Sequence, residues 1–236
     1  MTSGNSGTWS GGATDVVIVG AGIIGLASAH ALLRGGASVR LVDRSLPGAG
    51  DSTKTGGGIR LAHGTEANVV LTQLSLPFWT GFPAVTGVDP GYRQTGHLFL
   101  TSAAKTDSQF RSQAEWVATL GVRSEVLSRN EIGRRWPHLS QIAFETGSYC
   151  DIGGYLDHHR VIHGYVRAVE AEGGIIVAGV PVDELLIDDG RVLGVGTPSG
   201  RFYASHVVNA AGASAGLIAA LAGLQIPFVS RRHELL

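Results

Sequence analysis

The chain has 236 residues, which exceeds one average domain and fits two interleaved domains. Apolar residues make up 44% and charged residues 16%, a composition that excludes a largely disordered chain. Eighteen basic and nineteen acidic residues give a formal net charge of −1, so no overall positive field favours binding to nucleic acid or to an anionic membrane.

The first elements form a βαβ unit. Residues 1–14 are rich in Gly, Ser and Thr, lack the features of a signal peptide, and are interpreted as a flexible leader. The run 16–33 carries no Asp, Glu, Lys or Arg, which raises the alternative of a membrane span. Because glycines interrupt this run and its first part is β-branched, we predict a strand over 16–19, a helix over 23–33 and no membrane span. A second buried strand follows over 39–42.

Helices and a hairpin are predicted further along the chain. The helices cover 67–80, 108–120, a short stretch after Ser128, and 159–172. Ser128 and Glu131 have the spacing of a capping box, which marks a helix start. Strands over 191–197 and 201–208 flank the turn 198–200 and are expected to pair antiparallel. Thirty-five glycines, about twice the usual share, indicate many tight turns.

The turn between the first strand and the first helix has the pattern G-x-G-x-x-G. Its glycines would permit the tight turn, the approach of a pyrophosphate and close helix–strand packing, while the helix start would bind the anion. Asp43 ends the second strand, where a carboxylate accepts hydrogen bonds from ribose hydroxyls. A glycine-rich turn that binds no nucleotide is the alternative. The candidate residues are Gly20, Gly22, Ile23, Ile24, Gly25 and Asp43.

Arg44 beside Asp43 has two interpretations, a site for a 2′-phosphate or a surface arginine.

The segments that follow favour a flavin over a nicotinamide nucleotide. After Asp43 comes a Gly- and Thr-rich loop over 46–59 and a long mixed region, whereas a nicotinamide domain normally continues with further βα units. The next buried strand of this sheet is predicted only at 207–208, where it enters a turn of small residues over 210–213. That turn would lie against the first glycine turn or a bound dinucleotide.

These segments together resemble the N-terminal half of the D-amino-acid oxidase superfamily of FAD-dependent oxidoreductases, closest to the sarcosine oxidase and dimethylglycine oxidase-like branch. The marks are 16–25 with Asp43-Arg44, the segment 50–60, Val180-Pro181-Val182 and 207–212. The resemblance implies a Rossmann-like FAD-binding domain interleaved with part of a mixed-sheet substrate domain, an α/β fold with an α+β insert.

The resemblance also implies roles for individual residues. The three glycines would line the FAD pyrophosphate, and Asp43 would bind the adenosine ribose. Further positions matched to contacts with the pyrophosphate, the isoalloxazine ring, adenine and the closing corner are, in that order, Ser52 and Thr53; Gly57, Gly58 and Ile59; Val182; and Ala210, Ala211 and Gly212.

Arg60 aligns with an arginine that binds the substrate carboxylate in amine-oxidising members. A guanidinium presents two parallel donors to a carboxylate and thereby fixes its orientation. The alternative is a surface ion pair with Glu66. His63 lies three residues on and either faces the same pocket or forms a local loop hydrogen bond.

The remaining candidates point away from metal chemistry. His158, His159 and His163 form a local cluster, but a solvated helix start is favoured over a metal site, and no metal is expected. His158 also lies near a histidine that carries covalent FMN in heterotetrameric sarcosine oxidases, which leaves covalent flavin open. The lone Cys150 is interpreted as a buried apolar filler, excludes an internal disulfide, and suits a reducing, cytoplasmic compartment.

The predicted domain order alternates along the chain. Residues 15–80 and 146–222 are assigned to the FAD-binding domain, 81–145 to a substrate-domain insertion, and 223–236 to the start of a return strand. Family members of this kind are longer, so we expect a fragment, a truncated form or one piece of a complex. The possible partner is then another subunit or the missing C-terminal half.

The predicted function is oxidation of a small carboxylate-bearing amine or amino acid, such as a sarcosine-like secondary amine, to an imine by hydride transfer to FAD. Two alternatives stay open: a 2-hydroxy acid substrate with the same cofactor, and a non-catalytic nucleotide-binding subunit.

Overall fold

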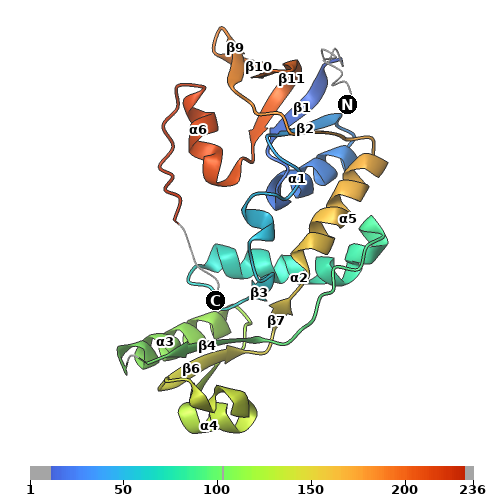
Figure 1. Cartoon of the computed structure of the whole chain (residues 1–236). Coiled ribbons are helices and arrows are strands. Elements are labelled where there is room, and N and C mark those ends of the chain that lie inside the picture. Colours follow the sequence, from blue (N-terminus) through green and yellow to red (C-terminus); the bar gives the residue numbers. More distant parts are fainter. Residues whose placement is uncertain (1–11, 103, 232–236) are drawn as a thin grey trace, which may run out of the picture. The chain divides into compact units, whose positions relative to one another are not determined.

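The computed structural model describes residues 12–102 and 104–231, so most of the predicted leader lies outside the described residues. Two compact units are present (Figure 1). Unit 1 combines Met1–Thr55, Val85–Val88 and His158–Leu236, and unit 2 combines Gly56–Ala84 and Asp89–Asp157. The chain crosses between the two units after Thr55, Ala84, Val88 and Asp157. The assignment of 15–80 and 146–222 to an FAD-binding domain, and of 81–145 to a substrate-domain insertion, stays a prediction. Which of these segments contact a cofactor stays a prediction.

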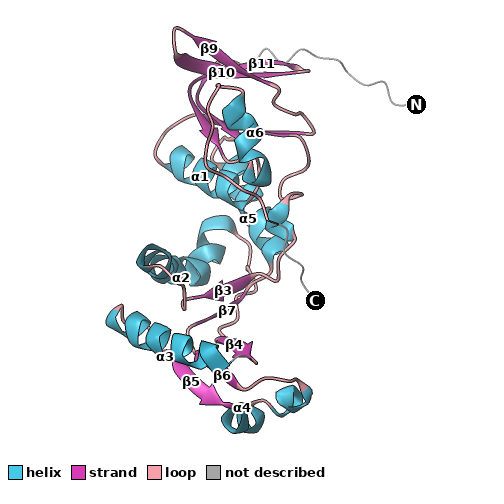
Figure 2. Cartoon of the chain, turned by 90° about the vertical axis from the view of Figure 1, so that its left-hand side faces the viewer, coloured by secondary structure: helices cyan, strands magenta, loops and turns pink. Residues whose placement is uncertain are grey.

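Unit 1 is built on a six-stranded sheet in the order β8-β2-β1-β11-β10-β9. The parallel part comprises β8 (Ile175–Ala178), β2 (Val39–Asp43), β1 (Thr14–Val19) and the second half of β11 (Gly200–Asn209). The first half of β11 pairs antiparallel with β10 (Arg191–Thr197), which pairs in turn with β9 (Glu184–Asp188) (Figure 2). This mixed sheet, with a Rossmann-like parallel part, confirms the predicted fold class.

The predicted βαβ unit and hairpin are confirmed. β1 reads Thr-Asp-Val-Val-Ile-Val, and its four apolar residues are all buried, as expected for a central parallel strand. Helix α1 (Ile23–Arg34) ends at Gly35. The predicted burial of 207–208 is wrong, because Val207 and Val208 are half-exposed: in the described part of the chain, their half of β11 pairs with β1 alone.

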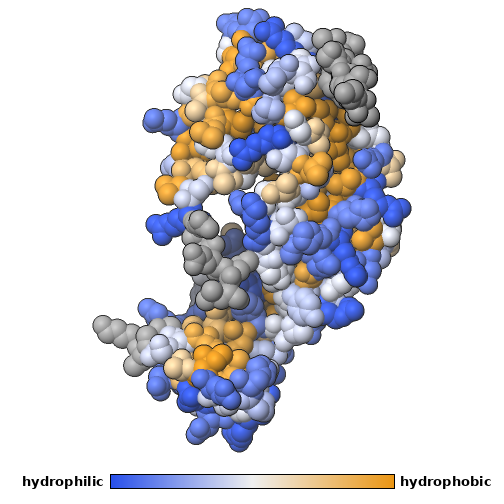
Figure 3. All heavy atoms as spheres, viewed as in Figure 1, coloured by the Kyte–Doolittle hydropathy of each residue, from blue (hydrophilic) through white to orange (hydrophobic). Residues whose placement is uncertain are grey.

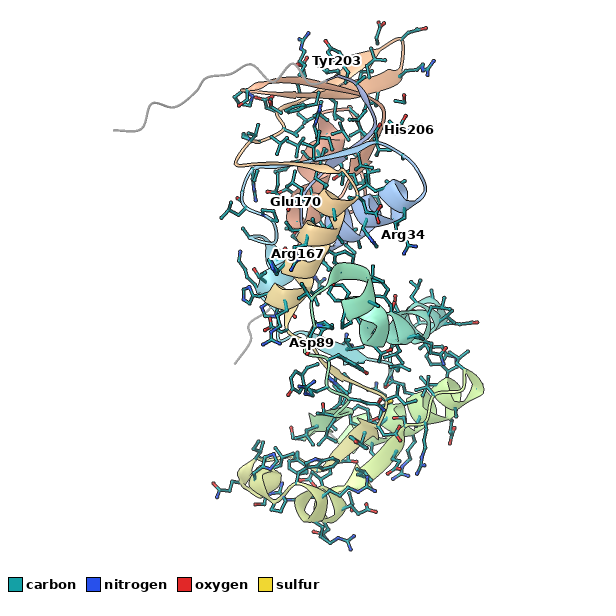
Figure 4. All side chains as sticks on the ribbon, turned by 90° about the vertical axis from the view of Figure 1, so that its right-hand side faces the viewer. Arg34, Asp89, Arg167, Glu170, Tyr203 and His206 are labelled. Atoms are coloured by element: carbon teal, nitrogen blue, oxygen red, sulfur yellow. The ribbon has the colours of Figure 1, made fainter. Side chains whose placement is uncertain are left out.

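Two helices of unit 1, α1 and α5 (His158–Ala171), pack against each other. α5 buries Val161, Ile162, Tyr165, Ala168 and Val169 along one face. Its charged residues Arg167 and Glu170 lie on the exposed face (Figure 4). The opposite side of the sheet has its own core, in which Val17, Val42 and Val195 pack with Phe202. The alternation of side chains along the strands therefore gives each face of the sheet its own apolar packing.

The contact between α1 and α5 predicts a pH-dependent stability. His30 on α1 is 7% exposed and packs edge-on to Tyr165 at 6.0 Å between ring centroids. Burial, and secondarily the charge of Arg34, lower the pKa of His30 below its usual 6.5, whereas Glu172 opposes them. The folded state therefore favours neutral His30. Its stabilising contribution is complete above pH 6.5 and is lost as the pH falls through the folded-state pKa.

We therefore expect the free energy of unfolding to fall less between pH 7.5 and pH 5 in His30→Phe than in the wild-type chain. Urea unfolding at the two pH values measures this difference, with the exposed His138→Phe as the control. Equal losses in the wild-type chain and His30→Phe would show that His30 is not the titrating group.

Unit 2 combines two small antiparallel sheets with helices. β3 (Gly58–Arg60) pairs with β7 (Gly153–Tyr155). β4 (His97–Thr101), β6 (Thr146–Cys150) and β5 (Glu125–Ser128) form the second sheet in that order. The helices are α2 (Glu66–Thr86), α3 (Ala104–Thr119) and α4 (Arg129–Arg135). The short strands of this unit were not predicted individually.

The capping box at the start of α4 is confirmed. The backbone amide of Glu131 donates to Ser128, and the Glu131 carboxylate accepts from the Ser128 amide at 2.8 Å.

The predicted end of α2 at residue 80 is wrong, because the helix continues to Thr86 through Pro77 and Pro83. Phe82, which is fully buried, anchors that last part by packing with Phe78 and Trp79. Tertiary packing therefore outweighs the helix-breaking residues.

Apolar side chains also remain exposed at the surface of unit 1. Leu217 on α6 (Ala215–Ala220) is 69% exposed, and Figure 3 shows apolar surface gathered over this helix.

Residues 224–231 form neither helix nor strand, and 232–236 lie outside the described residues, so the predicted return strand stays a prediction. Within 12–102 and 104–231, no helix has both the length and the apolar character that a bilayer crossing requires.

Candidate functional sites

The first site is a cavity of about 520 Å³ in unit 1, at the carboxyl ends of the parallel strands. In open parallel sheets this is the edge where ligands bind, and the volume is in the range of small-molecule sites. Most of the predicted cofactor-binding residues line this cavity: Gly20, Gly22, Ile23, Ile24, Asp43, Arg44, Ser52, Val182, Ala210, Ala211 and Gly212.

Two backbone corners form the wall of this cavity. Gly20 has a φ of 108°, in the left-handed region that favours glycine, and its amide donates to Val42 at 2.9 Å. The second corner is held to the first strand by a hydrogen bond from the Ala210 amide to the Val19 carbonyl at 2.9 Å. A Cβ on Gly20 would collide with the Ala210 carbonyl oxygen. The glycine turn and the alanine corner therefore touch and need a residue without a side chain at position 20.

The helix start in this cavity is completed from a distant part of the chain. The Ile23 amide, the first of α1, donates to the Ser52 hydroxyl at 2.9 Å. Gly22 precedes the helix and offers no side-chain cap, and a Cβ there would lie 3.0 Å from Ser52 Oγ. Because the hydroxyl accepts from Ile23, its own hydrogen stays available to a ligand oxygen. An anion could therefore receive donors from both the helix start and Ser52.

Asp43 does more than end the second strand. Its carboxylate accepts from the Ala21 amide at 2.7 Å through Oδ2 and from the Ser45 amide at 2.8 Å through Oδ1. The side chain therefore fixes the glycine turn in place. Two carboxylate oxygens provide about four acceptor positions, so Asp43 retains capacity for ligand hydroxyls.

Two of the predicted cofactor residues of unit 1 do not line the cavity. A Cβ on Gly25 would collide with the Gly20 carbonyl oxygen, so this glycine serves close helix–strand packing. The Thr53 hydroxyl donates to the Gly48 carbonyl at 2.8 Å within its own loop. Thr53 therefore supports the loop that presents Ser52.

Sequence reasoning did not single out several other lining residues as site candidates: Ser45, Lys54, Pro181, Ser214, Leu217 and Ile218. Lys54 is the one basic residue of the Gly- and Thr-rich loop 46–59, a signal that could have identified it. The residues after Gly212 belong to a short 3-10 turn and α6, which have no distinctive local pattern.

The second site is a separate cavity of about 550 Å³ within unit 2. Arg60 lines it from β3, together with Gly58 and Ile59. The guanidinium lies over the Phe99 ring at 5.7 Å from the centroid. Among the residues that the structure describes, Arg60 forms no ion pair with Glu66, so its charge is available to an anion in the cavity.

Gly57 lies beside this site without lining the cavity. Its φ is 66°, and a Cβ there would collide with the Leu156 carbonyl oxygen. The Leu156 amide donates to the Gly57 carbonyl at 3.0 Å. Gly57 therefore shapes the strand entry of β3 by close backbone approach.

His63 lines the second cavity, which sequence reasoning left open. Its Nε2 lies 3.2 Å from the Thr72 hydroxyl of α2. Burial, followed by the charge of Arg60, lowers its pKa, while a hydrogen bond with the Arg60 backbone carbonyl acts in the opposite direction. The cavity thus contains one permanent cation and one titratable imidazole.

Two further candidates from the sequence are Cys150 and the histidine cluster at the start of α5. Cys150 is 2% exposed within the core formed with Leu61 and Val117, and burial raises its thiol pKa, which confirms it as a buried filler. The rings of His158 and His159, at the start of α5, are tilted by 45° with their centroids 4.3 Å apart. In the described part of the chain, no three His, Cys, Asp or Glu side chains gather as a metal site.

Comparison with known proteins adds to this geometry. A protein-family model described as DAO, FAD dependent oxidoreductase, matches residues 15–236. The sarcosine oxidase subunit beta of Rhizobium meliloti (strain 1021) is 27% identical over 222 residues, which cover 92% of this chain and 53% of that protein. The mitochondrial sarcosine dehydrogenase of Homo sapiens is 26% identical and is matched over 93% of this chain and 25% of its own length.

Solved structures show the same fold. L-proline dehydrogenase from P. horikoshii superposes with a TM-score of 0.82 at 27% identity, covering 90% of this chain and 56% of that chain. L-amino acid deaminase from Proteus vulgaris has a TM-score of 0.82 at 21% identity, covering 96% and 53%. The chain therefore spans about half the length, or less, of the relatives it matches.

Proposed function

Because the chain belongs to the DAO family of FAD-dependent oxidoreductases, we propose that it binds FAD through unit 1 and contributes Arg60 of unit 2 to the oxidation of a carboxylate-bearing amine. The names of the relatives, which include sarcosine oxidase and L-proline dehydrogenase, support a small amine or amino acid as the substrate class. A sarcosine-like secondary amine is the finer proposal.

The observation that carries the cofactor assignment is the contact between the two corners at Gly20 and Ala210. Both corners line one cavity, and neither position projects a large side chain into it. An extended diphosphate needs backbone donors without bulky neighbours, which these corners and the start of α1 provide. The residues present therefore fit a dinucleotide such as FAD.

Each part of the nucleotide has a matching group in unit 1. The amides at the start of α1 and the Ser52 hydroxyl would donate to the pyrophosphate. Asp43 would accept from ribose hydroxyls with the capacity left by its two backbone hydrogen bonds. Val182 and Pro181 line the same cavity and would contact adenine. Contact of Gly57, Gly58 and Ile59 with the isoalloxazine ring stays a proposal from the family resemblance.

FAD, when bound, supplies the hydride acceptor for the carbon next to the substrate nitrogen. The residues of this chain supply binding and orientation. Arg60, whose guanidinium lies over the Phe99 ring, would hold the substrate carboxylate through two parallel hydrogen bonds. Fixing the carboxylate limits the positions that the neighbouring carbon can occupy, which is the main contribution of such a residue to rate.

A partner polypeptide is also proposed. The Rhizobium relative is named as a subunit, and this chain covers 53% of its length. The exposed apolar surface on α6 would be covered by another subunit or by a further part of the same protein.

A 2-hydroxy acid would use Arg60 in the same way as an amino acid. The experiment therefore needs one probe of each substrate class.

Two measurements test this function. When the purified chain is denatured, the released ligand should have the mass of FAD. A peptide containing His158 should carry no flavin-sized mass addition, and such an addition would show that the flavin is covalently attached. In the FAD-loaded chain without oxygen, sarcosine should bleach the flavin absorbance and lactate should not. A folded chain that neither carries nor takes up FAD would instead favour a non-catalytic subunit.

A further inference from the structure

The charges that line the first cavity balance before a diphosphate enters. The ionisable lining residues are Asp43, Arg44, Asp51 and Lys54, so their formal charges sum to zero. A diphosphate that joins two nucleosides brings two negative charges, and the start of a helix offsets only about half of one. A cation close to the phosphates would supply further compensation.

The loop that carries Lys54 is fastened to the glycine turn at two points. The Gly48 amide donates to the Ala21 carbonyl at 2.9 Å. The Ser52 hydroxyl accepts from the Ile23 amide, also at 2.9 Å. The backbone of this loop is therefore fixed beside the amides that would bind the phosphates.

Lys54 follows Ser52 by two residues and closes the short 3-10 turn Asp51–Thr53. Its amide donates to the Asp51 carbonyl at 3.1 Å, which holds its backbone, whereas its exposed side chain lines the cavity. Within the part of the chain that the structure describes, no carboxylate forms an ion pair with Lys54. Its ammonium can therefore turn toward an anion at the start of α1.

Arg44, the other cation of the lining, lies beside the adenosine end of the proposed site. It directly follows Asp43, the proposed ribose ligand, whose carbonyl accepts from the Val180 amide at 2.9 Å. Val180 begins the segment that includes Val182, the proposed adenine contact. Arg44 therefore accompanies the ribose and adenine, and Lys54 is the cation on the side of the diphosphate.

We propose that Lys54 binds the diphosphate of FAD and supplies the positive charge that the glycine turn and Ser52 lack. A lysine acts toward phosphate as a flexible point charge, so this role needs proximity and no fixed geometry. Asp51, in the same loop and the same lining, opposes it, because its carboxylate repels the phosphates. The inference rests on the proposed function, because it takes FAD as the ligand of this cavity.

The test is titration of the purified chain, freed of nucleotide, with FAD at about 0.05 M and about 0.5 M NaCl, followed by flavin fluorescence. Lys54→Met should weaken FAD binding about 10-fold at the lower salt concentration, and salt should then change its affinity less than that of the wild-type chain. Lys54→Arg should retain most of the affinity, and Asp51→Asn should strengthen binding about threefold. Arg167→Met removes an exposed arginine of α5 outside the cavity and should resemble the wild-type chain.

A second pair of probes separates the charge of Lys54 from damage to its loop. ADP carries a diphosphate and adenosine carries no phosphate, so Lys54→Met should weaken competition by ADP against FAD and leave competition by adenosine unchanged. An equal loss with both probes would assign Lys54 a structural role and overturn the proposal. Circular dichroism establishes that each variant is folded.

Failure of this inference differs from failure of the proposed function. If Lys54→Met bound FAD with wild-type affinity and salt dependence while Gly22→Val lost affinity, Lys54 would not be a phosphate ligand, and the assignment of the cavity to FAD would stand. If the folded wild-type chain did not bind FAD at all, both the assignment and the role of Lys54 would be overturned.

Discussion

Gly22→Val should weaken binding of FAD to the purified chain by about 100-fold or more, equivalent to at least about 2.7 kcal/mol. Gly22 lines the first cavity at the start of α1, and a Cβ there would already lie 3.0 Å from the Ser52 hydroxyl. The added methyl groups would occupy space at the helix start and displace the hydroxyl that accepts from Ile23. Both the anion-binding amides and the Ser52 donor would be affected.

The fold should tolerate this substitution. Gly22 has a φ of −76°, which any residue can adopt, whereas Gly20 needs the left-handed region. The matched control is Gly12→Val, the same change at an exposed position of unit 1 with nothing within 4 Å of its Cβ. Equilibrium titration followed by flavin fluorescence measures the affinities. Wild-type affinity in a folded Gly22→Val chain would contradict the placement of the diphosphate at this turn.

Arg60→Met should weaken carboxylate binding by at least about 100-fold while leaving FAD affinity unchanged. Two charge-assisted hydrogen bonds are lost, and such bonds contribute about 1.5–3 kcal/mol each. Methionine preserves much of the apolar contact with Phe99, so the change acts mainly on charge. Sarcosine binding by calorimetry measures the effect directly, and the rate of flavin bleaching without oxygen should fall by a similar factor.

Arg60→Lys distinguishes charge from geometry. Lysine keeps the positive charge but loses the planar fork, so we expect an intermediate loss of about 10-fold. Arg123→Met removes an exposed arginine of unit 2, which pairs with Glu125, and should leave binding unchanged. If Arg60→Met bound sarcosine as tightly as the wild-type chain, the substrate carboxylate would have to be held elsewhere.

The first βαβ unit could be predicted from the sequence because three local signals agree there. A β-branched run, a glycine turn and an apolar helix follow one another within 20 residues, and the resulting family assignment is confirmed. The cofactor-binding roles of the individual residues stay predictions. The structure does bring most of them to one cavity and separates Gly25, Thr53 and the 57–59 segment from its lining.

The sheets of unit 2 could not be predicted because their signals are non-local. β6 reads Thr-Gly-Ser-Tyr-Cys, which is neither strongly apolar nor alternating, and it pairs with β4 about 50 residues earlier. β3 has three residues, of which the first is glycine. Such strands form because a partner strand and a core are available, and the sequence records neither.

The site interactions that sequence reasoning missed have the same cause. Ser52 meets Ile23 across 29 residues, and Asp43 meets Ala21 across 22. Neither contact has a fixed spacing that a pattern could detect. His63 was recognised as a neighbour of Arg60 in sequence, but its hydrogen bond to Thr72 depends on how α2 packs. Local motifs therefore identified candidate site residues, whereas the contacts that each candidate makes depend on tertiary packing.

The most direct test is hydrogen–deuterium exchange of the purified chain with and without FAD. If one nucleotide binds between the glycine turn and the alanine corner, peptides covering 20–25 and 210–214 should be protected together, with one FAD per chain. Binding that protects one of these corners and not the other, or no binding by the folded chain, would contradict the assignment of this cavity to FAD.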